Sequence, residues 1–336
     1  VTGVQTCALP ILRGIGLCFF LEVAGGILEE PADLRFHDDG TVSLCVGAQA
    51  MGQGHLATYP ALIAQRLGID VSRVQLMAGD SDQTPGIVAT VGSRSTMMVG
   101  SAAALACDES IRRGLALAAQ HLEAALEDVH FQNGLYTVAG TDRSVHLLDL
   151  TRLSKANKAS NQVALPSLDN VAKFTSPSMT YPNGCHVCEV EIDPDTGHVE
   201  VVAYTAVDDV GVMLQPQVIE GQIMGGVAQG LGQALGERLR YDPQGQLLTG
   251  SFMDYPMPRA DTVPAMVIAH HSVPCRTNPL GVKGAGESGV AGSLPSAMNA
   301  VLHALSYAGV SALDMPFTSE RVWQALQTAQ PAQQRV

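Results

Sequence analysis

The chain has 336 residues, of which 46% are hydrophobic and 15% charged, and its formal net charge is -13. This length suffices for about two domains with full cores, and this composition excludes an intrinsically disordered chain. No run of five basic residues occurs, which argues against nucleic acid or an anionic membrane surface as a partner.

Residues 1–11 resemble the translation of a sequencing-adapter oligonucleotide, and we exclude them from the fold predictions as one would exclude an expression tag. A remnant of a signal peptide is the alternative, but the segment has neither a basic start nor a continuous apolar stretch. If residues 1–11 derive from an adapter, we expect the natural sequence to begin near Leu12 and the protein to be the C-terminal part of a longer one.

Hydrophobic periodicity predicts a mixture of strands and helices in the first part of the chain, residues 12–150. Polar turns separate the predicted strands, and the second predicted helix is rich in alanine. In chain order we expect a strand at 14–25, a hairpin of 34–36 with 41–46, a helix at 56–67, a strand at 74–77 and a long helix at 99–126.

Residues 151–178 are mostly polar and irregular, which favours a connection to a second part at 179–328, followed by a tail at 329–336. Antiparallel hairpins stand beside separate long helices, so we predict an α+β fold of two mixed α/β subdomains rather than a doubly wound sheet. The second part is expected to hold a hairpin of 187–192 with 199–207, a helix at 217–236, a strand at 263–271 and helices at 295–307 and 319–329.

The predicted helix at 217–236 contains six glycines, mostly four residues apart. A glycine inside a helix costs about 0.5–1 kcal/mol relative to Ala, so we expect this helix to gain from close approach to a neighbour. A pair of transmembrane helices is the alternative, but the polar side chains of Glu220, Gln222 and Gln229 argue against it.

Cys185 and Cys188 invite a metal or redox interpretation. On a predicted strand, however, a three-residue spacing directs two side chains to opposite faces. No second cysteine pair completes a zinc site, and the other cysteines are scattered. The absence of a disulfide framework indicates a reducing, cytoplasmic compartment.

Four glycine-rich loops with polar tips are the candidate binding elements. Glycine loops and helix N-termini bind anions through backbone N–H groups, which suits an acidic chain with few cations. Together these loops predict a cofactor held by N–H groups and amide side chains. They are the loop from Met51 to His55, the loop from Val91 to Ser95, the Gln222 segment and the loop from Gly281 to Glu287.

Several side chains in these loops admit two interpretations. Arg94 and Lys283 could contact an anionic cofactor or could be ion-paired elsewhere, and His55 could be a ligand, a general base or a histidine satisfied by backbone. No Ser-His-Asp order recommends a hydrolase. An NAD- or flavin-binding oxidoreductase would need a strand–GxGxxG–helix unit, which the sequence lacks.

These motifs resemble one family when they are taken in order. Their order and spacing resemble those of the molybdenum-binding large subunit of the xanthine dehydrogenase/aldehyde oxidase family. The motifs that carry this resemblance are the loops named above, the strand and turn from Cys188 to Gly197, the segment Asp208–Gly211 and the glycine-rich helix. The resemblance is nearest to the carbon-monoxide-dehydrogenase-like large subunits and extends from Gly14 to about Leu326.

The resemblance implies a molybdopterin-binding domain and roles for ten residues. Glu287 falls on the family's catalytic base, Gln53 and Gln222 on cofactor-contacting amides, and Ser93 on the loop that wraps the pterin. The metal would be held by the pterin dithiolene and by no protein side chain. The implied cofactor-binding residues are Met51, Gly52, Gln53, Gly92, Ser93, Arg94, Ser95, Gln222 and Gly286.

The resemblance also implies an activity and partners. The activity is oxidative hydroxylation of a small-molecule substrate with water as the oxygen source and Glu287 as the base. The cofactor is molybdenum–molybdopterin, with its cytosine dinucleotide form as one option. A small iron–sulfur subunit with 2Fe-2S clusters and a medium subunit with FAD are the expected partners, with a dimer of heterotrimers as one assembly and membrane association through partners left open.

Two departures limit what the resemblance implies. Gln215 stands where many relatives carry Asn, and the family's earlier half, with its substrate loops, is absent. We therefore expect this chain alone to be inactive, and carbon monoxide, aldehydes, purines and N-heterocycles all remain open as substrates. A structural or assembly paralogue without activity is the alternative, although the retention of Gln53, Gln222 and Glu287 argues against it.

Overall fold

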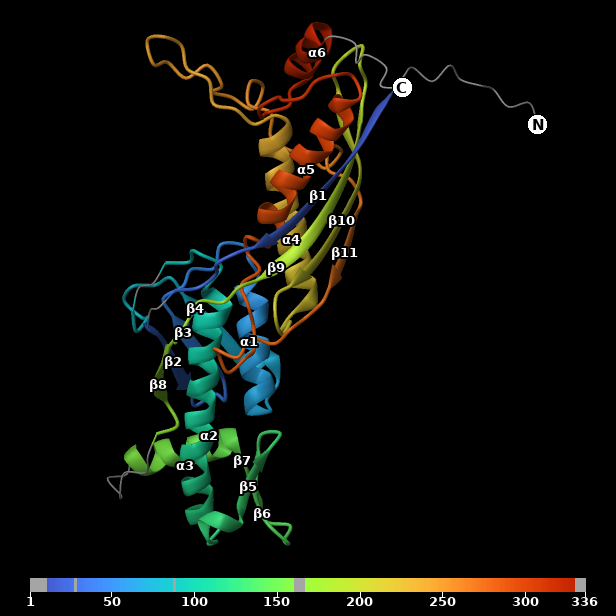
Figure 1. Ribbon diagram of the computed structural model, residues 1–336. Coiled ribbons are helices and arrows are strands. Elements are labelled where there is room, and N and C mark those ends of the chain that lie inside the picture. Colours follow the sequence, from blue (N-terminus) through green and yellow to red (C-terminus); the bar gives the residue numbers. More distant parts are fainter. Residues whose placement is uncertain (1–10, 27–28, 87–88, 160–166, 330–336) are drawn as a thin grey trace, which may run out of the picture.

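The computed structural model describes residues 11–26, 29–86, 89–159 and 167–329, and it shows an elongated molecule (Figure 1). The adapter-like segment therefore lies almost wholly outside the described residues, as does most of the expected tail. The predicted α+β class is confirmed by three separate sheets and the helices that cover them. None of the described helices is both long and apolar enough to cross a membrane.

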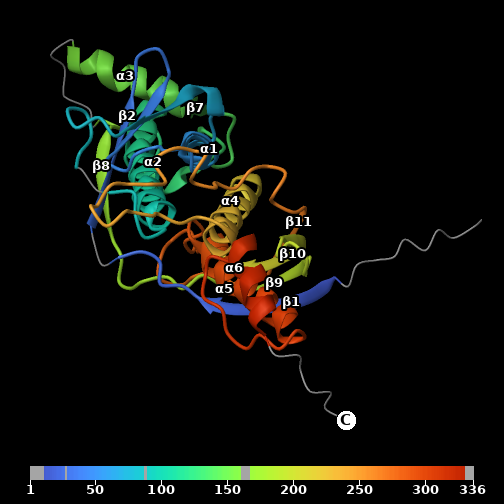
Figure 2. The same cartoon turned by 90° about the horizontal axis from the view of Figure 1, so that it is seen from above.

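One end of the molecule is built on a four-stranded sheet in the order β1-β9-β10-β11. These strands are β1 (Leu12–Leu21), β9 (Asn183–Ile192), β10 (Val199–Asp209) and β11 (Met266–His270). Helices α4 (Pro216–Leu235) and α5 (Ser288–Ser306) pack against one face of the sheet, and α6 (Ser319–Thr328) lies beyond them (Figures 1 and 2).

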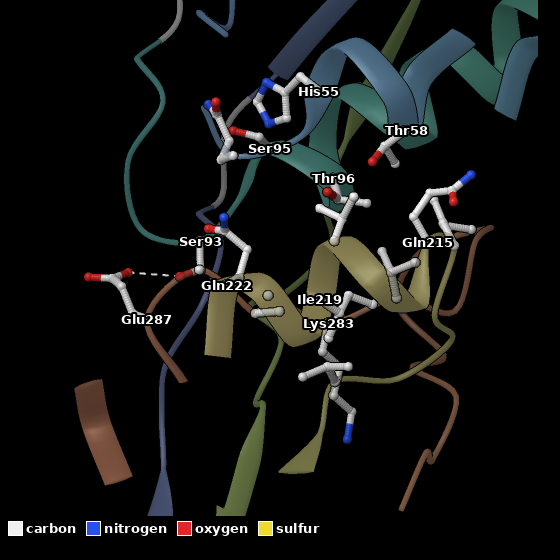
Figure 3. Close-up of a pocket in the computed structure, with 18 of the residues that line it drawn as sticks. His55, Thr58, Ser93, Ser95, Thr96, Gln215, Ile219, Gln222, Lys283 and Glu287 are labelled. Carbon is white, nitrogen blue, oxygen red and sulfur yellow. Dashed lines mark hydrogen bonds between the residues drawn. The ribbon is translucent and has the colours of Figure 1, made fainter. Parts of the chain in front are cut away.

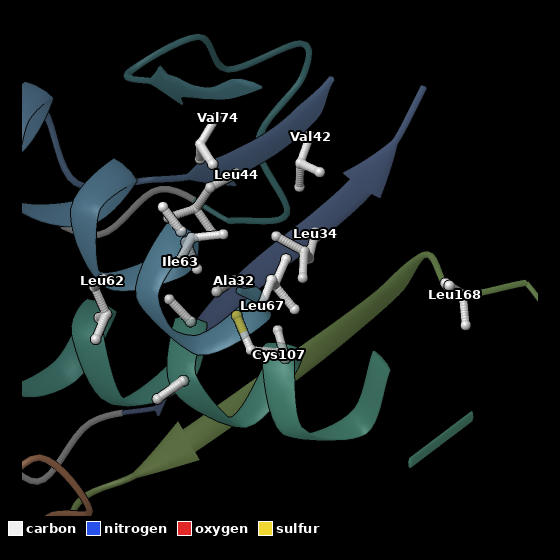
Figure 4. Close-up of a cluster of buried hydrophobic side chains, with 14 of the residues drawn as sticks. Ala32, Leu34, Val42, Leu44, Leu62, Ile63, Leu67, Val74, Cys107 and Leu168 are labelled. Carbon is white, nitrogen blue, oxygen red and sulfur yellow. The ribbon is translucent and has the colours of Figure 1, made fainter. Parts of the chain in front are cut away.

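The second unit has a sheet in the order β4-β3-β2-β8, under helices α1 and α2. Figure 4 shows Leu34, Leu44, Ile63 and Leu67 between these strands and helices. The elements are β2 (Glu29–Phe36), β3 (Val42–Val46), α1 (His55–Leu67), β4 (Val74–Ala78), a short π-helical turn (Thr96–Gly100), α2 (Ser101–His121) and β8 (Asn170–Thr175).

A small third sheet lies at the far end of α2 (Figure 1). Its strands are β5 (Val129–Gln132), β6 (Leu135–Val138) and β7 (Ser144–His146), and α3 (Leu147–Ala159) follows. None of these elements was predicted. The expected irregular connection, 151–178, contains the second part of α3 and the strand β8, which pairs with β2.

The strand β1 joins a sheet that is distant in sequence. It was predicted within the first part of the chain, but it pairs with β9 from Leu12↔Ile192 to Leu21↔Asn183. A Cβ atom added to Gly14 or Gly16 would lie 2.1 Å from Ala300 O or 2.0 Å from Ser296 O. Helix α5 therefore lies directly on the backbone of β1. This helix begins at Ser288 and not at Pro295, which it contains.

The glycine-rich helix α4 crosses α5 closely at some of its glycines only. A Cβ on Gly226 would lie 2.8 Å from Gly289 Cα, and one on Gly230 would lie 2.0 Å from Ser293 Oγ. By contrast, nothing lies within 4 Å of a Cβ added to Gly221 or Gly225. The prediction of close approach is confirmed at the first pair and wrong at the second pair, which faces open space.

We expect Gly226→Ala to destabilise the protein by about 1–3 kcal/mol, because the added methyl overpacks the α4–α5 crossing. The matched control is Gly225→Ala, next to it on the same helix, which we expect to be neutral or stabilising by about 0.4–1 kcal/mol. Urea unfolding measures both free energies. Equal effects of the two substitutions would contradict the close crossing.

Candidate functional site

Side chains from all four predicted loops line one cavity of about 460 Å³. It lies between the N-terminal half of α4 and the loops that precede α1 and α2 (Figure 3). The site residues predicted from sequence that line it are Met51, Gln53, Gly92, Ser93, Ser95, Gln222, Gly286 and Glu287. Gly52 and Arg94, which were also predicted, are not among its lining residues.

The loop before α1 uses glycines to approach α4. Gly52 and Gly54 have φ values of 98° and 82°, in the left-handed region that glycine adopts without strain. A Cβ on Gly54 would lie 2.4 Å from the Val218 side chain. The Gln53 amide is held within the loop, because its Oε1 accepts from Met51 N (2.6 Å) and its Nε2 donates to Gln49 O (2.8 Å).

The Ser93 loop and the Glu287 loop pack directly on each other. A Cβ on Gly284 would lie 2.6 Å from Ser93 O and 2.7 Å from Ser93 Cβ, so only glycine fits at this position. Glu287 directly precedes α5, and its exposed carboxylate accepts a hydrogen bond from Ser93 Oγ (2.9 Å, dashed in Figure 3). The helix N-terminus favours negative charge at this point.

A second carboxylate, which sequence reasoning missed, lies at the same hydroxyl. Glu22 follows the end of β1, and its Oε1 is 3.4 Å from Ser93 Oγ. Burial and then the negative charge of Glu287 raise the pKa of the Glu22 carboxyl to about 7. The only signal in the sequence was a single acid at the end of an apolar strand.

The cations of the two loops are both engaged by acids, which favours the ion-paired interpretation of each. Arg94 is buried and forms an ion pair with buried Glu30. Its guanidinium also donates to Ala89 O (3.2 Å). Lys283 Nζ lies 2.5 Å from Asp209 Oδ2. Cofactor contact through the Arg94 side chain therefore does not fit its position.

His55 begins α1 and lines the cavity with a neutral ring. Burial lowers the pKa of His55 to about 4, and the ring stacks on Tyr59 with centroids 4.7 Å apart. Its Nδ1 is buried and has no hydrogen-bond partner among the described residues. A buried polar atom of this kind is costly unless a ligand or water completes it.

The part of the chain that the structure describes contains no metal site built from protein side chains. Among the described residues, no group of three or more His, Cys, Asp or Glu side chains could hold a metal ion. Cys185 is half-buried and Cys188 is fully buried on β9, on alternate faces of the strand. The predicted opposite orientation of these two thiols is confirmed.

Comparison with known proteins decides the family. The model of the molybdopterin cofactor-binding domain matches residues 5–264. The chain belongs to this family. The Glu287 loop lies beyond residue 264. It lies within the sequence similarity to individual proteins, which extends over 94% of this chain.

Relatives of this molybdopterin-binding chain are large subunits of oxidoreductases. It is 36% identical to the carbon monoxide dehydrogenase large chain of Hydrogenophaga pseudoflava, over 94% of this chain and 41% of that protein. It is 32% identical to the nicotine 6-hydroxylase large subunit of Paenarthrobacter nicotinovorans, over 93% of this chain and 40% of that one. The chain thus spans about two fifths of the length of these relatives.

Solved structures show the same fold. The carbon monoxide dehydrogenase from Oligotropha carboxidovorans matches with a TM-score of 0.86 at 32% identity, over 94% of this chain and 41% of that chain. Quinoline 2-oxidoreductase from Pseudomonas putida 86 matches with a TM-score of 0.86 at 31% identity, over 95% of this chain and 42% of that one. The predicted resemblance to the xanthine dehydrogenase/aldehyde oxidase family is confirmed.

We expect Arg94→Met to cost about 3–5 kcal/mol of stability, because it leaves the buried Glu30 carboxylate unpaired. The double variant Arg94→Met, Glu30→Gln should recover much of this loss. The control Arg259→Met, which breaks an exposed pair with Asp261, should leave the free energy of unfolding almost unchanged. Urea unfolding compares the three; an Arg94→Met loss no larger than the control loss would contradict a structural role.

Proposed function

We propose that this chain is the cofactor-binding part of a molybdenum hydroxylase in which Glu287 is the general base. The observation that supports it most is the convergence of four glycine-rich loops on one cavity, with the Glu287 carboxylate at its lining. When bound, the molybdenum cofactor would supply an activated water-derived oxygen and accept the electrons of the oxidation.

The residues of the cavity fit such a cofactor. The Gln222 amide and the Ser95 hydroxyl offer neutral hydrogen-bonding groups at its wall. The Gln53 amide and the Gly92 backbone come from adjacent loops. Neutral donors suit a pterin, and backbone N–H groups of glycine loops suit its phosphate. Gln215, the departure from many relatives, also lines the cavity.

In this proposal Glu287 is placed to act as a base, and the hydrogen bond from Ser93 orients its carboxylate. Its exposed carboxylate can reach a ligand in the cavity, while the hydrogen bond from Ser93 fixes one of its oxygens. A positioned carboxylate of this kind contributes about 10²–10⁴-fold through proton transfer. In this proposal Glu287 takes the proton that the substrate water must lose.

The remainder of the enzyme would come from elsewhere. The outer face of β1 exposes Ile15, Leu17, Phe19 and Leu21, each by more than half, and an apolar stripe of this kind is typical of a surface that another part covers. We propose that the missing half of the subunit supplies further cofactor contacts and the substrate loops. Electrons would leave through 2Fe-2S and FAD subunits in the cytoplasm.

The substrate proposed is a small electron-poor molecule of the carbon monoxide, aldehyde or N-heterocycle class, with the cytosine dinucleotide as the proposed form of the pterin. The relatives, which include a carbon monoxide dehydrogenase large chain and a nicotine 6-hydroxylase large subunit, support this range of substrates. A paralogue without activity remains the second candidate, and the next two experiments separate the two.

In the complete protein that contains this chain, we expect Glu287→Gln to lower kcat by about 10²–10⁴-fold without loss of molybdenum, because it removes the base and keeps the shape. Glu220→Gln, an exposed acid on α4 outside the cavity lining, is the control and should turn over normally. Steady-state kinetics and metal analysis measure both. Near-normal turnover of Glu287→Gln would remove Glu287 from the role of base.

We expect the purified 336-residue chain alone to hold substoichiometric molybdenum and to show no hydroxylase turnover, because it spans only 41% of its relative's length. Elemental analysis and substrate assays check this, with the complete protein as the positive control. Stoichiometric metal together with turnover in the isolated chain would defeat the expectation.

A further inference from the structure

Two carboxylates meet at one serine hydroxyl beside the cavity. Ser93 Oγ lies 2.9 Å from Glu287 Oε2 and 3.4 Å from Glu22 Oε1. The three residues come from the end of β1, the loop before α2 and the loop before α5, so only the folded chain brings them together. The proposed function uses Glu287 and leaves Glu22 without a role.

The number of protons available fixes the direction of these hydrogen bonds. A serine hydroxyl carries one proton and can donate to one acceptor at a time. The shorter contact, to Glu287, takes that proton. The contact between Ser93 Oγ and Glu22 Oε1 is then a hydrogen bond only if Glu22 carries a proton and donates it to the Ser93 oxygen.

The surroundings of Glu22 favour its neutral form. Its Oε2 is buried and has no hydrogen-bond partner among the described residues, which is costly for a charged oxygen. The two cations of the adjoining loops are paired with other acids, Arg94 with Glu30 and Lys283 with Asp209. Two carboxylates this close, without a cation, share a proton.

No other charge acts on Glu22 from the segments that touch it. Pro182 O accepts from Glu22 N (2.9 Å), and residues 180–183 carry no acidic or basic side chain. Their one titratable group is the Tyr181 phenol. From the other two segments, the Glu287 carboxylate and the Ser93 hydroxyl are the groups that influence the pKa of Glu22, after its burial.

We propose that Glu22 is a positioning residue for Glu287: it holds the proton that the two acids share and, through the Ser93 hydroxyl, orients the Glu287 carboxylate. This inference rests on the proposed function of Glu287 as the base. With Glu22 neutral, Ser93 donates to Glu287. With Glu22 ionised, the second charge repels Glu287 and competes for the same hydroxyl proton.

This arrangement makes turnover sensitive to pH. The pKa of Glu22 is raised from the usual carboxyl range to about 7, so its proton is present at pH 6 and is lost as the pH rises through 7. Orientation of Glu287 by Ser93 is therefore complete below pH 7 and declines above it. The rate constant kcat should follow that decline, while KM should change little.

The first experiment observes the proton itself. In the complete protein without its cofactor, infrared difference spectroscopy should show a protonated-carboxyl band that titrates near pH 7 and is missing in Glu22→Gln. In Glu287→Gln the midpoint should fall, because the charge of Glu287 helps to raise the pKa of Glu22. The proposal is overturned if Glu22→Gln removes no such band. This readout does not depend on whether Glu287 is the base.

The second experiment separates positioning from packing in the loaded enzyme. Glu22→Gln stays neutral and can still donate through its amide, so it should retain kcat at pH 6 and lose the decline above pH 7. Glu22→Leu has no donor and should lower kcat about 10-fold at every pH with an unchanged KM. In a Ser93→Ala background, the substitution Glu22→Gln should no longer change how kcat depends on pH, because the hydroxyl that links the two acids is gone.

The outcomes distinguish this inference from the proposed function. Loss of activity in Glu287→Gln, with the same pH profile in the wild type, Glu22→Gln and Glu22→Leu, overturns the role of Glu22 and leaves Glu287 as the base. Full activity of Glu287→Gln overturns the base, and with it the positioning role, even if the infrared band confirms where the proton resides.

Discussion

Close approach of backbones at glycines is the constraint on which the site depends. Gly226 lets α4 cross α5, and Gly284 lets the Glu287 loop lie on the Ser93 loop. A side chain at either position would overlap backbone atoms or the atoms of Ser93. The first contact lies within one unit, and the second joins the two units, so the packing that joins them also places Glu287 beside the Ser93 loop.

The electrostatics of the site follow from this packing. The chain is acidic, and the two cations in the site loops are held by Glu30 and Asp209. The cavity therefore presents neutral amides, hydroxyls and backbone groups, with the Glu287 carboxylate at its lining and Glu22 behind Ser93. Binding of an anionic cofactor would depend on N–H dipoles more than on opposite charge.

The sequence motifs predicted which loops meet at the cavity, but they could not predict side-chain contacts between segments that lie far apart in the chain. Gln53 and Glu287 lie in loops that directly precede α1 and α5, Gln222 lies in the first half of α4, and all three line one cavity. Arg94 could not be oriented from its loop, since Glu30 lies 64 positions away. Glu22 could not be found, since Ser93 lies 71 positions from it.

By itself the sequence determined the hairpins, the long helices and the resemblance to a molybdopterin-binding family, because periodicity and motif order are local properties of the chain. The tertiary structure decided that β1 pairs with β9, that α3 and β8 form within an apparently irregular stretch, and that Glu22 meets Glu287. These features depend on contacts between segments that lie far apart in the chain. The free energy of such packing is not encoded in any local sequence pattern.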